Sequence, residues 1–414
     1  MKKPELLLPA GSLSKLKTAL LYGADAVYAG APEMSLRAAS KFPLEDIKAG
    51  ADFAHELGKK IYLTLNLFTN NNDAAKLPEF VKVLKEINPD GVIISDPGVF
   101  EYVKKEIPGM PLHVSTQANV CSWLTVKFWQ ELGASLCVLG REVSFAESVE
   151  IRKKCSDIKL EIFVHGAMCV SYSGRCLMSA FMASRSANRG ACAHSCRWKY
   201  KGKLILEEEL RPGEYLEMYE DDKGTYILNS KDLCLMPKLD KVLEAGFDSF
   251  KIEGRNKTEY YVAQTARVYR KAIDDYFTAP EKWQPDIYMK ELETLQNRGY
   301  TLGFFDGVPD ERAQDYQDAS SRSEWRNGGK VLENKDGFLK IEVKHKLKKG
   351  MEIEALPPSQ FEPIKIALDK IYDCRNNNLV EEINPGIAGQ CVRIQIDNKY
   401  KELIVPNTVI RLKV

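Results

Sequence analysis

ELLLPAGSLSKLKTALLYGADAVYAG, residues 5–30, contains the pattern that decides the fold. Two short apolar runs that favour strands flank a segment in which Leu13, Leu16 and Leu20 fall on one face of a helix. The helical segment ends at Gly-Ala, which is typical of a glycine that terminates a helix. The stretch therefore predicts a strand, a helix and a second strand, which is the repeating unit of a parallel sheet.

The same unit recurs as far as about residue 255. The strand candidates are ELLLPAG, DAVYAG, KIYLTLN, DGVIIS, LHVSTQ, SLCVLG, EIFVHG and DSFKIEG. Eight parallel units in this length predict an α/β fold of the (β/α)8 TIM-like barrel type rather than an open doubly wound sheet. No glycine-rich dinucleotide fingerprint follows the first strand, which argues further against a Rossmann domain.

An irregular segment of about residues 167–245 separates the seventh strand candidate from the eighth. Loops of this length are uncommon unless they have a function, and loops that follow barrel strands lie at the catalytic face. We therefore expect a barrel with a cysteine-rich insertion after strand 7 and a helical extension, together spanning residues 1–325. Short alternating strands with Gly and Pro between them predict a small antiparallel β-barrel over residues 326–414.

Overall charge gives little indication of a partner. The chain has 59 Lys and Arg against 58 Asp and Glu, a net charge of +1, so any anionic partner must bind a local patch. No run approaches the roughly 18 apolar residues that span a bilayer, and the first residues lack the apolar core of a signal peptide. We expect a cytoplasmic protein with no membrane contact.

Five of the ten cysteines lie in the insertion: Cys169, Cys176, Cys192, Cys196 and Cys234. In a reducing compartment, clustered cysteines are more often metal ligands or catalytic thiols than disulfides. Thiolates that converge from loops typically hold an iron–sulfur cluster, and the wide spacing does not fit the two close pairs of a structural zinc site. Two alternatives remain open: core filling, and one nucleophilic thiol paired with a histidine.

Polar residues follow several of the predicted strands and point to the barrel mouth. His165 ends the seventh strand, where three roles are open: a base, a hydrogen-bond donor to the substrate, or a histidine of the core. Three amides follow the third and fifth strands, where they line the mouth or cap local turns: Asn66, Gln117 and Asn119. Three charged residues end the eighth strand, and they suit a carboxylate or phosphate unless they form ordinary ion pairs: Lys251, Glu253 and Arg255.

The residues of a conventional protease are missing from the sequence. There is no HExxH motif and no GxSxG motif, and the five scattered histidines do not suggest a Ser-His-Asp set. A peptidase would need an unconventional mechanism.

Four stretches together resemble the signature of peptidase family U32: FVHGAMCVSYSGRCLMS (163–179), NRGACAHSCRW (188–198), NSKDLCLM (229–236) and SFKIEGR (249–255). The resemblance covers nearly the whole chain. Its size and β-barrel tail are most similar to a branch implicated in prephenate-dependent 5-hydroxylation of the wobble uridine of tRNA. Sister branches act on ribosomal RNA and on the quinone ring of ubiquinone.

The resemblance implies a 4Fe-4S cluster on Cys169, Cys176, Cys192 and Cys234, with Cys196 as a possible substitute. It also implies tRNA as partner and prephenate as hydroxyl donor. The residues expected to be catalytic are His165, Gln117, Arg255 and Glu253. Those expected to bind substrate are Asn66, Asn119, Arg141, Arg175 and Lys251, with Arg141, Arg175 and Arg255 as clamps for a dicarboxylate.

The C-terminal segment would help to bind RNA in this interpretation. It has 16 Lys and Arg against 12 Asp and Glu, and its basic run contains Lys344, Lys346, Lys348 and Lys349. A solvated strand face is the simpler interpretation of that run. Two other functions are weighed against RNA hydroxylation: a U32-type peptidase or collagenase-like hydrolase, and a non-catalytic scaffold that binds a hydroxylase.

Overall fold

The computed structural model describes most of the chain. It covers residues 2–414 except 31–41, 170, 172, 174, 177, 186, 188–191, 198–205, 208–214, 217–218, 222–223, 227–229, 310–312, 314–322 and 387–388.

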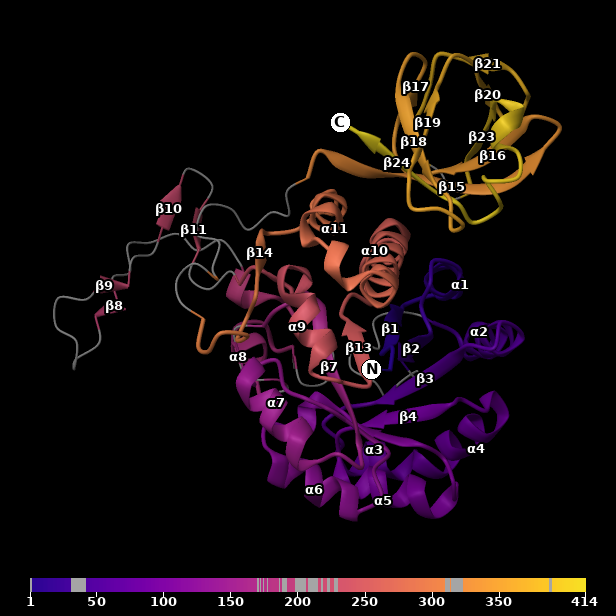
Figure 1. The fold of residues 1–414 in the computed structure, drawn as a ribbon. Coiled ribbons are helices and arrows are strands. Elements are labelled where there is room, and N and C mark those ends of the chain that lie inside the picture. The colour runs from indigo at the N-terminus through magenta and orange to yellow at the C-terminus, as the bar shows by residue number, and fades with distance from the viewer. Residues whose placement is uncertain are drawn as a thin grey trace. The chain divides into compact units, whose positions relative to one another are not determined.

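Within the described residues, eight parallel strands form a closed barrel (Figure 1). Neighbours in the chain pair in order, and the last strand, β13, closes the ring by pairing with both β1 and β7. All eight predicted strands are present, which confirms the TIM-like fold. Their bounds are β1 Glu5–Ala10, β2 Ala26–Gly30, β3 Lys60–Leu65, β4 Gly91–Ile94, β5 Leu112–Val114, β6 Leu136–Val138, β7 Lys159–Ala167 and β13 Ser249–Ile252.

The helices between the strands follow the predicted repeat. Several end at glycines with positive φ, among them Gly58 at 64° and Gly246 at 73°, as the glycine stops predicted. The bounds are α1 Leu13–Leu21, α2 Leu44–Glu56, α3 Asn71–Ala75, α4 Leu77–Ile87, α5 Pro97–Glu106, α6 Trp123–Glu131, α7 Phe145–Lys154, α9 Leu239–Glu244, α10 Glu259–Thr278 and α11 Pro285–Leu292.

The barrel interior is partly polar. Alternate residues of the strands point inward, and they form a buried cluster of Leu7, Ala26, Tyr28, Tyr62 and Ile93. Glu161 of β7 and Lys251 of β13 also lie in the barrel interior, where they form a buried ion pair with 2.7 Å between Oε1 and Nζ.

The structure contains two further strands that the sequence analysis missed, one in the insertion and one after α11. β12 (Asp232–Cys234) pairs antiparallel with the end of β7, and β14 (Tyr300–Thr301) pairs parallel with β12. These strands extend the barrel wall beyond the end of β6. The remaining described elements of the insertion are α8 Met178–Ala183, η3 Ser195–Arg197, β8 Leu206–Glu207, β9 Tyr215–Leu216, β10 Tyr219–Asp221, β11 Gly224–Tyr226 and η4 Met236–Lys238.

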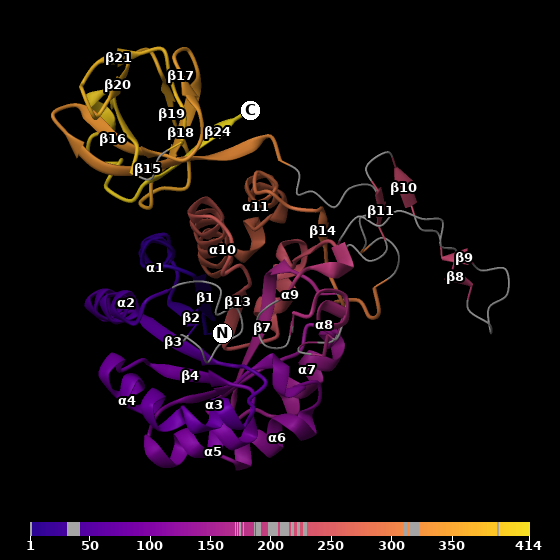
Figure 2. The same cartoon turned by 180° about the vertical axis from the view of Figure 1, so that it is seen from behind.

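The C-terminal segment forms a curled antiparallel sheet around its own apolar core (Figure 2). The strand order is β19-β18-β24-β15-β16-β23-β20-β21, and the first and last strands do not pair within the described residues. The antiparallel prediction is therefore confirmed, with the barrel only partly closed. The strands are β15 Trp325–Lys335, β16 Phe338–Val343, β17 Leu347–Lys348, β18 Glu352–Leu356, β19 Ile364–Ala367, β20 Ile371–Asp373, β21 Leu379–Val380, β22 Glu382–Ile383, β23 Cys391–Gln395 and β24 Val409–Lys413.

Contacts divide the chain into two compact units that do not follow chain order. The first contains Met1–Leu13, Asp25–Arg255 and Asn297–Arg322. The second contains Ser14–Ala24, Asn256–Gln296 and Ser323–Val414. Its last segment begins three residues before the boundary predicted at residue 326.

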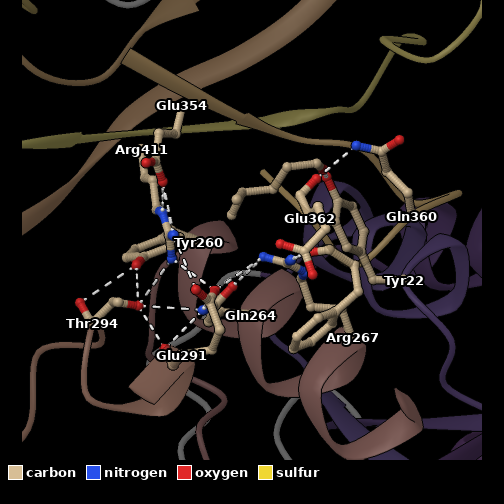
Figure 3. Close-up of polar contacts among 12 residues, drawn as sticks. Tyr22, Tyr260, Gln264, Arg267, Glu291, Thr294, Glu354, Gln360, Glu362 and Arg411 are labelled. Atoms are coloured by element: carbon tan, nitrogen blue, oxygen red, sulfur yellow. Dashed lines mark hydrogen bonds and ion pairs between the residues drawn. The ribbon is translucent and has the colours of Figure 1, made fainter. Parts of the chain in front are cut away.

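Polar contacts join the helices of the second unit to its sheet. The Tyr22 hydroxyl donates to the Leu356 carbonyl at 2.6 Å and accepts from the Val409 N–H at 2.8 Å. Arg411 of β24 is 3% exposed and pairs with Glu291 at 3.0 Å and with Glu354 at 2.7 Å, as Figure 3 shows. A buried charge of this kind is tolerated only because it lies next to groups of opposite charge.

Candidate active site at the barrel mouth

The loop that follows β7 extends across the carboxyl end of the barrel. The backbone N–H and the Oγ of Ser173 donate to Glu142, which follows β6, at 3.4 and 3.2 Å. The guanidinium of Arg175 lies 5.8 Å from the ring centroid of Phe68, which follows β3. Because β3 and β7 stand four strands apart in an eight-stranded ring, these contacts place Ser173 and Arg175 over the mouth.

A β-bulge in β7 shapes the wall beneath this loop. The register between β7 and β13 shifts between Lys251 and Ile252, so that the His165 carbonyl accepts from the Glu253 N–H at 2.9 Å. Gly166 has a φ of 116°, and a Cβ there would lie 2.4 Å from the Glu253 carbonyl oxygen. Glycine thus allows β7 and the end of β13 to approach closely, and bulges of this kind often adjoin active sites.

Arg141 is held from two sides next to that wall. Its guanidinium pairs with the Glu253 carboxylate at 3.1 Å and lies over the Phe163 ring, 3.6 Å from the centroid. The two charged side chains are only 15% and 13% exposed. An arginine fixed between a carboxylate and an aromatic face presents its remaining donors in a defined direction, which favours recognition of planar anions.

Arg141 and Cys169 line the same pocket, which lies wholly within the first unit. Its volume is about 260 Å³. Two further charged residues, small hydroxyl-bearing residues and apolar groups complete the lining: Glu142, Lys231, Ser171, Ser173, Ser230, Thr301, Met168, Gly303, Phe304, Val308, Pro309 and Ala313. The volume lies just below the roughly 300–1,000 Å³ of most ligand sites, so the pocket suits a small organic molecule.

His165 and Cys234 lie behind the loop rather than open to solvent. They are register partners across β7 and β12, and each side chain is 1% exposed. The His165 ring stands 5.4 Å from the Tyr300 ring.

The other clustered thiols are placed differently from core cysteines. Cys169 is exposed, and Cys176, Cys192 and Cys196 are half-buried. The Cys192 sulfur accepts from the His194 N–H at 3.4 Å, and α8 contacts the η3 turn that contains Cys196. Across the described ranges of the chain, no three His, Cys, Asp or Glu side chains are gathered as a metal site. The ligand set of the cluster stays a prediction.

The charged residues at the end of β13 lie at different depths. Lys251 is buried in the barrel interior, where its Nζ pairs with Glu161 and lies 4.6 Å from the Tyr28 ring centroid. Arg255 is buried at the mouth and donates to the Thr64 Oγ1 of β3 at 3.2 Å. Arg255 therefore lies at the predicted depth for a mouth residue, whereas Lys251 lies below it.

The predicted amides surround the same opening. Asn66 and Gln117 are buried, and Asn119 is exposed with a φ of 61°, where it ends the short η1 helix (Thr116–Ala118). Asn119 thus has the turn role that the sequence left open. Buried polar atoms in proteins usually have a hydrogen-bond partner. The Gln117 Oε1 and the Thr116 Oγ1 are buried and have none among the described residues.

Sequence reasoning missed three residues that shape this site: Phe163, Glu142 and Glu161. Glu142 directly follows a strand, next to Arg141, so its position alone could have identified it. Phe163 and Glu161 lie inside a strand and give no such signal.

Comparisons with known proteins agree with this architecture. Residues 11–315 match peptidase family U32, and residues 324–405 match the peptidase family U32 C-terminal domain. The chain is 41% identical over 399 residues to "tRNA hydroxylation protein P" of Escherichia coli, covering 86% of this chain and 87% of that protein. It is 37% identical over 414 residues to "tRNA hydroxylation protein P1" of Bacillus subtilis, covering 99% of this chain and 95% of that protein.

A more distant relative has a different named substrate. The chain is 34% identical over 270 residues to "23S rRNA 5-hydroxycytidine C2501 synthase" of Escherichia coli, covering 65% of this chain and 39% of that protein.

Across the part of the chain that is described, no helix combines the length and hydropathy of a membrane span.

Proposed function

The chain belongs to peptidase family U32, and from this premise we propose that it is a tRNA-modifying enzyme that hydroxylates its RNA substrate. The observation that carries the proposal is the near full-length similarity to proteins named for tRNA hydroxylation. The site supports it, because the mouth has a fixed arginine, buried amides and thiols but no conventional protease residues.

We further propose that the reaction is 5-hydroxylation of the wobble uridine, with prephenate as hydroxyl donor. Prephenate is a dicarboxylate, and Arg141 would bind one carboxylate through its free-facing N–H groups in the pocket beside Cys169. Arg175 and Arg255 would bind the second carboxylate or the RNA. Asn66 and Gln117 would orient the bound molecules through their amides, and His165 and Glu253 would handle protons.

A 4Fe-4S cluster is proposed as cofactor, held by Cys169, Cys176, Cys192 and Cys234, with Cys196 as a substitute. Thiolates are the usual ligands of such clusters. Three of the four proposed ligands, Cys169, Cys176 and Cys192, are exposed or half-buried, whereas Cys234 is buried, and the structure does not gather them into a metal site among its described residues. When bound, the cluster would supply electron transfer or hold the loop in place. Iron and sulfide counting on anaerobically purified protein tests this, and iron-free protein would refute it.

Peptide hydrolysis is not favoured over RNA hydroxylation. Relatives that cover 86% and 99% of this chain are named for tRNA hydroxylation. One that covers 84% of it is named an uncharacterized protease. A scaffold role predicts that single substitutions in the pocket leave the modification intact. We also propose that the protein acts in the cytoplasm, since tRNA is its proposed substrate.

The decisive test is nucleoside analysis of tRNA from a strain that lacks this gene and any second copy. We expect 5-hydroxyuridine derivatives to disappear and to return with the wild-type gene. Arg141→Lys keeps the charge but loses the forked geometry, so we expect at least a tenfold loss of modification at limiting donor, about 1.4 kcal/mol. Arg270→Lys, in a pair with Asp274 on α10, is the matched control and should modify normally. Unchanged tRNA in the deletion strain would refute the function.

A further inference from the structure

Two cysteines of the second unit face each other across neighbouring strands. β20 and β23 are antiparallel with Asp373 opposite Val392, so the next pair along the ladder is Cys374 and Cys391. The Cys374 N–H donates to the Cys391 carbonyl at 3.2 Å. Residues opposed in this way have Cα atoms about 5.5 Å apart, which lies within the range that disulfides span, roughly 4.4–6.8 Å.

The two side chains point away from the core of the sheet. Val392 and Asp373 are buried, and side chains alternate between the two faces of a strand. Cys374 and Cys391 therefore share the other face, where both are half-buried. A small reagent can reach them there.

Burial and the neighbouring thiol both affect the reactivity of Cys374. Burial, and next the hydrogen bond and charge of the Cys391 side chain, raise the pKa of the Cys374 thiol to about 12. Only a thiolate attacks a disulfide sulfur, so this raised pKa slows a first attack by Cys374. Once the Cys391 sulfur is part of a mixed disulfide, Cys374 can attack that sulfur effectively because the two residues are held close together. The charged groups around the pair are Lys340, Glu342, Asp373, Arg375 and Arg393.

We propose that Cys374 and Cys391 form a reversible disulfide and are a modification site for small-molecule disulfides such as glutathione disulfide. The Cys391 thiolate attacks one sulfur of glutathione disulfide, whose S–S bond breaks and releases one glutathione. The Cys374 thiolate then attacks the Cys391 sulfur and releases the second. The protein thiols lose two electrons and two protons, and both pass to the two glutathione molecules.

The bridge would close the chain segment between residues 374 and 391, which contains β21 and β22. β22 pairs with β17, where Glu382 is opposite Lys348 of the basic run. Oxidation would restrict this segment in the unfolded chain, so the oxidised form should be the more stable one.

The full-length protein tests this inference without any assay of RNA modification. After treatment with glutathione disulfide and alkylation of the remaining thiols, peptide mass spectrometry should find Cys374 linked to Cys391. The thermal unfolding midpoint should rise, and dithiothreitol should reverse both changes. In Cys374→Ser, Cys391 should instead carry one glutathione and the midpoint should not rise.

Two results would overturn the inference in correctly folded wild-type protein: both cysteines recovered alkylated, or each recovered with its own glutathione. A bifunctional alkylating probe that fluoresces only when it joins two neighbouring thiols gives a second measurement on the wild type. It should link these two residues, and failure to link them would contradict the geometry.

Discussion

Gly166 is the residue at which the wall of the site depends most directly on backbone conformation. We predict that Gly166→Ala costs about 1–3 kcal/mol of stability from backbone strain alone, because its φ of 116° is one that L residues avoid. The new Cβ would also meet the Glu253 carbonyl and displace the carboxylate that holds Arg141. Urea unfolding and the KM for the hydroxyl donor should both change.

Gly246→Ala is the matched control for this prediction. Gly246 also has a positive φ, but a Cβ there would contact nothing within 4 Å. We expect a cost of about 1–2 kcal/mol and an unchanged KM. Equal changes of KM in the two variants would contradict the proposed role of Gly166.

His113 gives a prediction about pH. Burial, and then the positive charges of Lys251, Lys159 and Lys60, lower the pKa of His113 to about 3. The folded protein keeps this ring neutral, whereas the unfolded chain takes up a proton below its ordinary pKa of 6.5. The free energy of unfolding should therefore fall by about 1.4 kcal/mol per pH unit below 6.5.

His113→Phe should remove this contribution and flatten the pH dependence of the unfolding midpoint between pH 6.5 and 4. Phenylalanine preserves the edge contact with the Tyr62 ring, whose centroid is 4.6 Å away. The His113 Nδ1 has no hydrogen-bond partner among the described residues, so none is lost there. A slope that survives in His113→Phe would rule out His113 as its source.

Single residues were predictable where position along a strand determines the environment. Arg141, after the sixth strand, lies in the pocket, and Arg255, after the eighth, lies at the mouth. The partner of each charge was not predictable. The position of Glu253 predicts a catalytic group, but it does not indicate the ion pair with Arg141 that the structure shows. Such pairs depend on neighbours more than a hundred residues away.

At the scale of elements, β7 and β13 are joined by a charge pair inside the barrel. Lys251→Met leaves Glu161 buried without its cation, and we predict a loss of about 3–5 kcal/mol. The double variant Lys251→Met/Glu161→Gln should recover most of it, because glutamine is uncharged and can still accept from Ser249, which donates at 2.8 Å. Urea unfolding at pH 7 measures both. Equal losses in the single and double variants would contradict the argument.

Most of the eight barrel strands were predictable because they precede or follow a helix with a clear apolar face and a glycine stop. β12 and β14 were not, since they have three and two residues and no period can be recognised at that length. Their pairing with the end of β7 is a tertiary contact that local propensity does not encode.

At the scale of the whole molecule, the second unit needs three distant pieces of chain. Truncation after residue 322 would leave Tyr22 and Glu291 without Leu356, Val409 and Arg411. We therefore predict that the truncated chain is insoluble or unfolds at a lower temperature than the full chain. Measurements of soluble yield and thermal unfolding test this.

Tyr22→Phe is the graded control. It removes one hydroxyl and leaves the Val409 N–H unsatisfied, at a cost of about 1–3 kcal/mol. It should remain soluble. A truncated chain that melted cooperatively at the wild-type temperature would show that Ser14–Ala24 and Asn256–Gln296 do not depend on the C-terminal sheet.

The hydrogen bonds of Tyr22 also have a consequence for synthesis on the ribosome. Its partners come 334 and 387 residues later in the chain. At about 5–20 residues per second, the nascent first helix waits roughly 20–80 seconds before those groups emerge. During that interval its apolar face has no final partner in the second unit. The protein should therefore depend on holding chaperones during translation, and slow synthesis should lower its yield more than that of a barrel built in chain order.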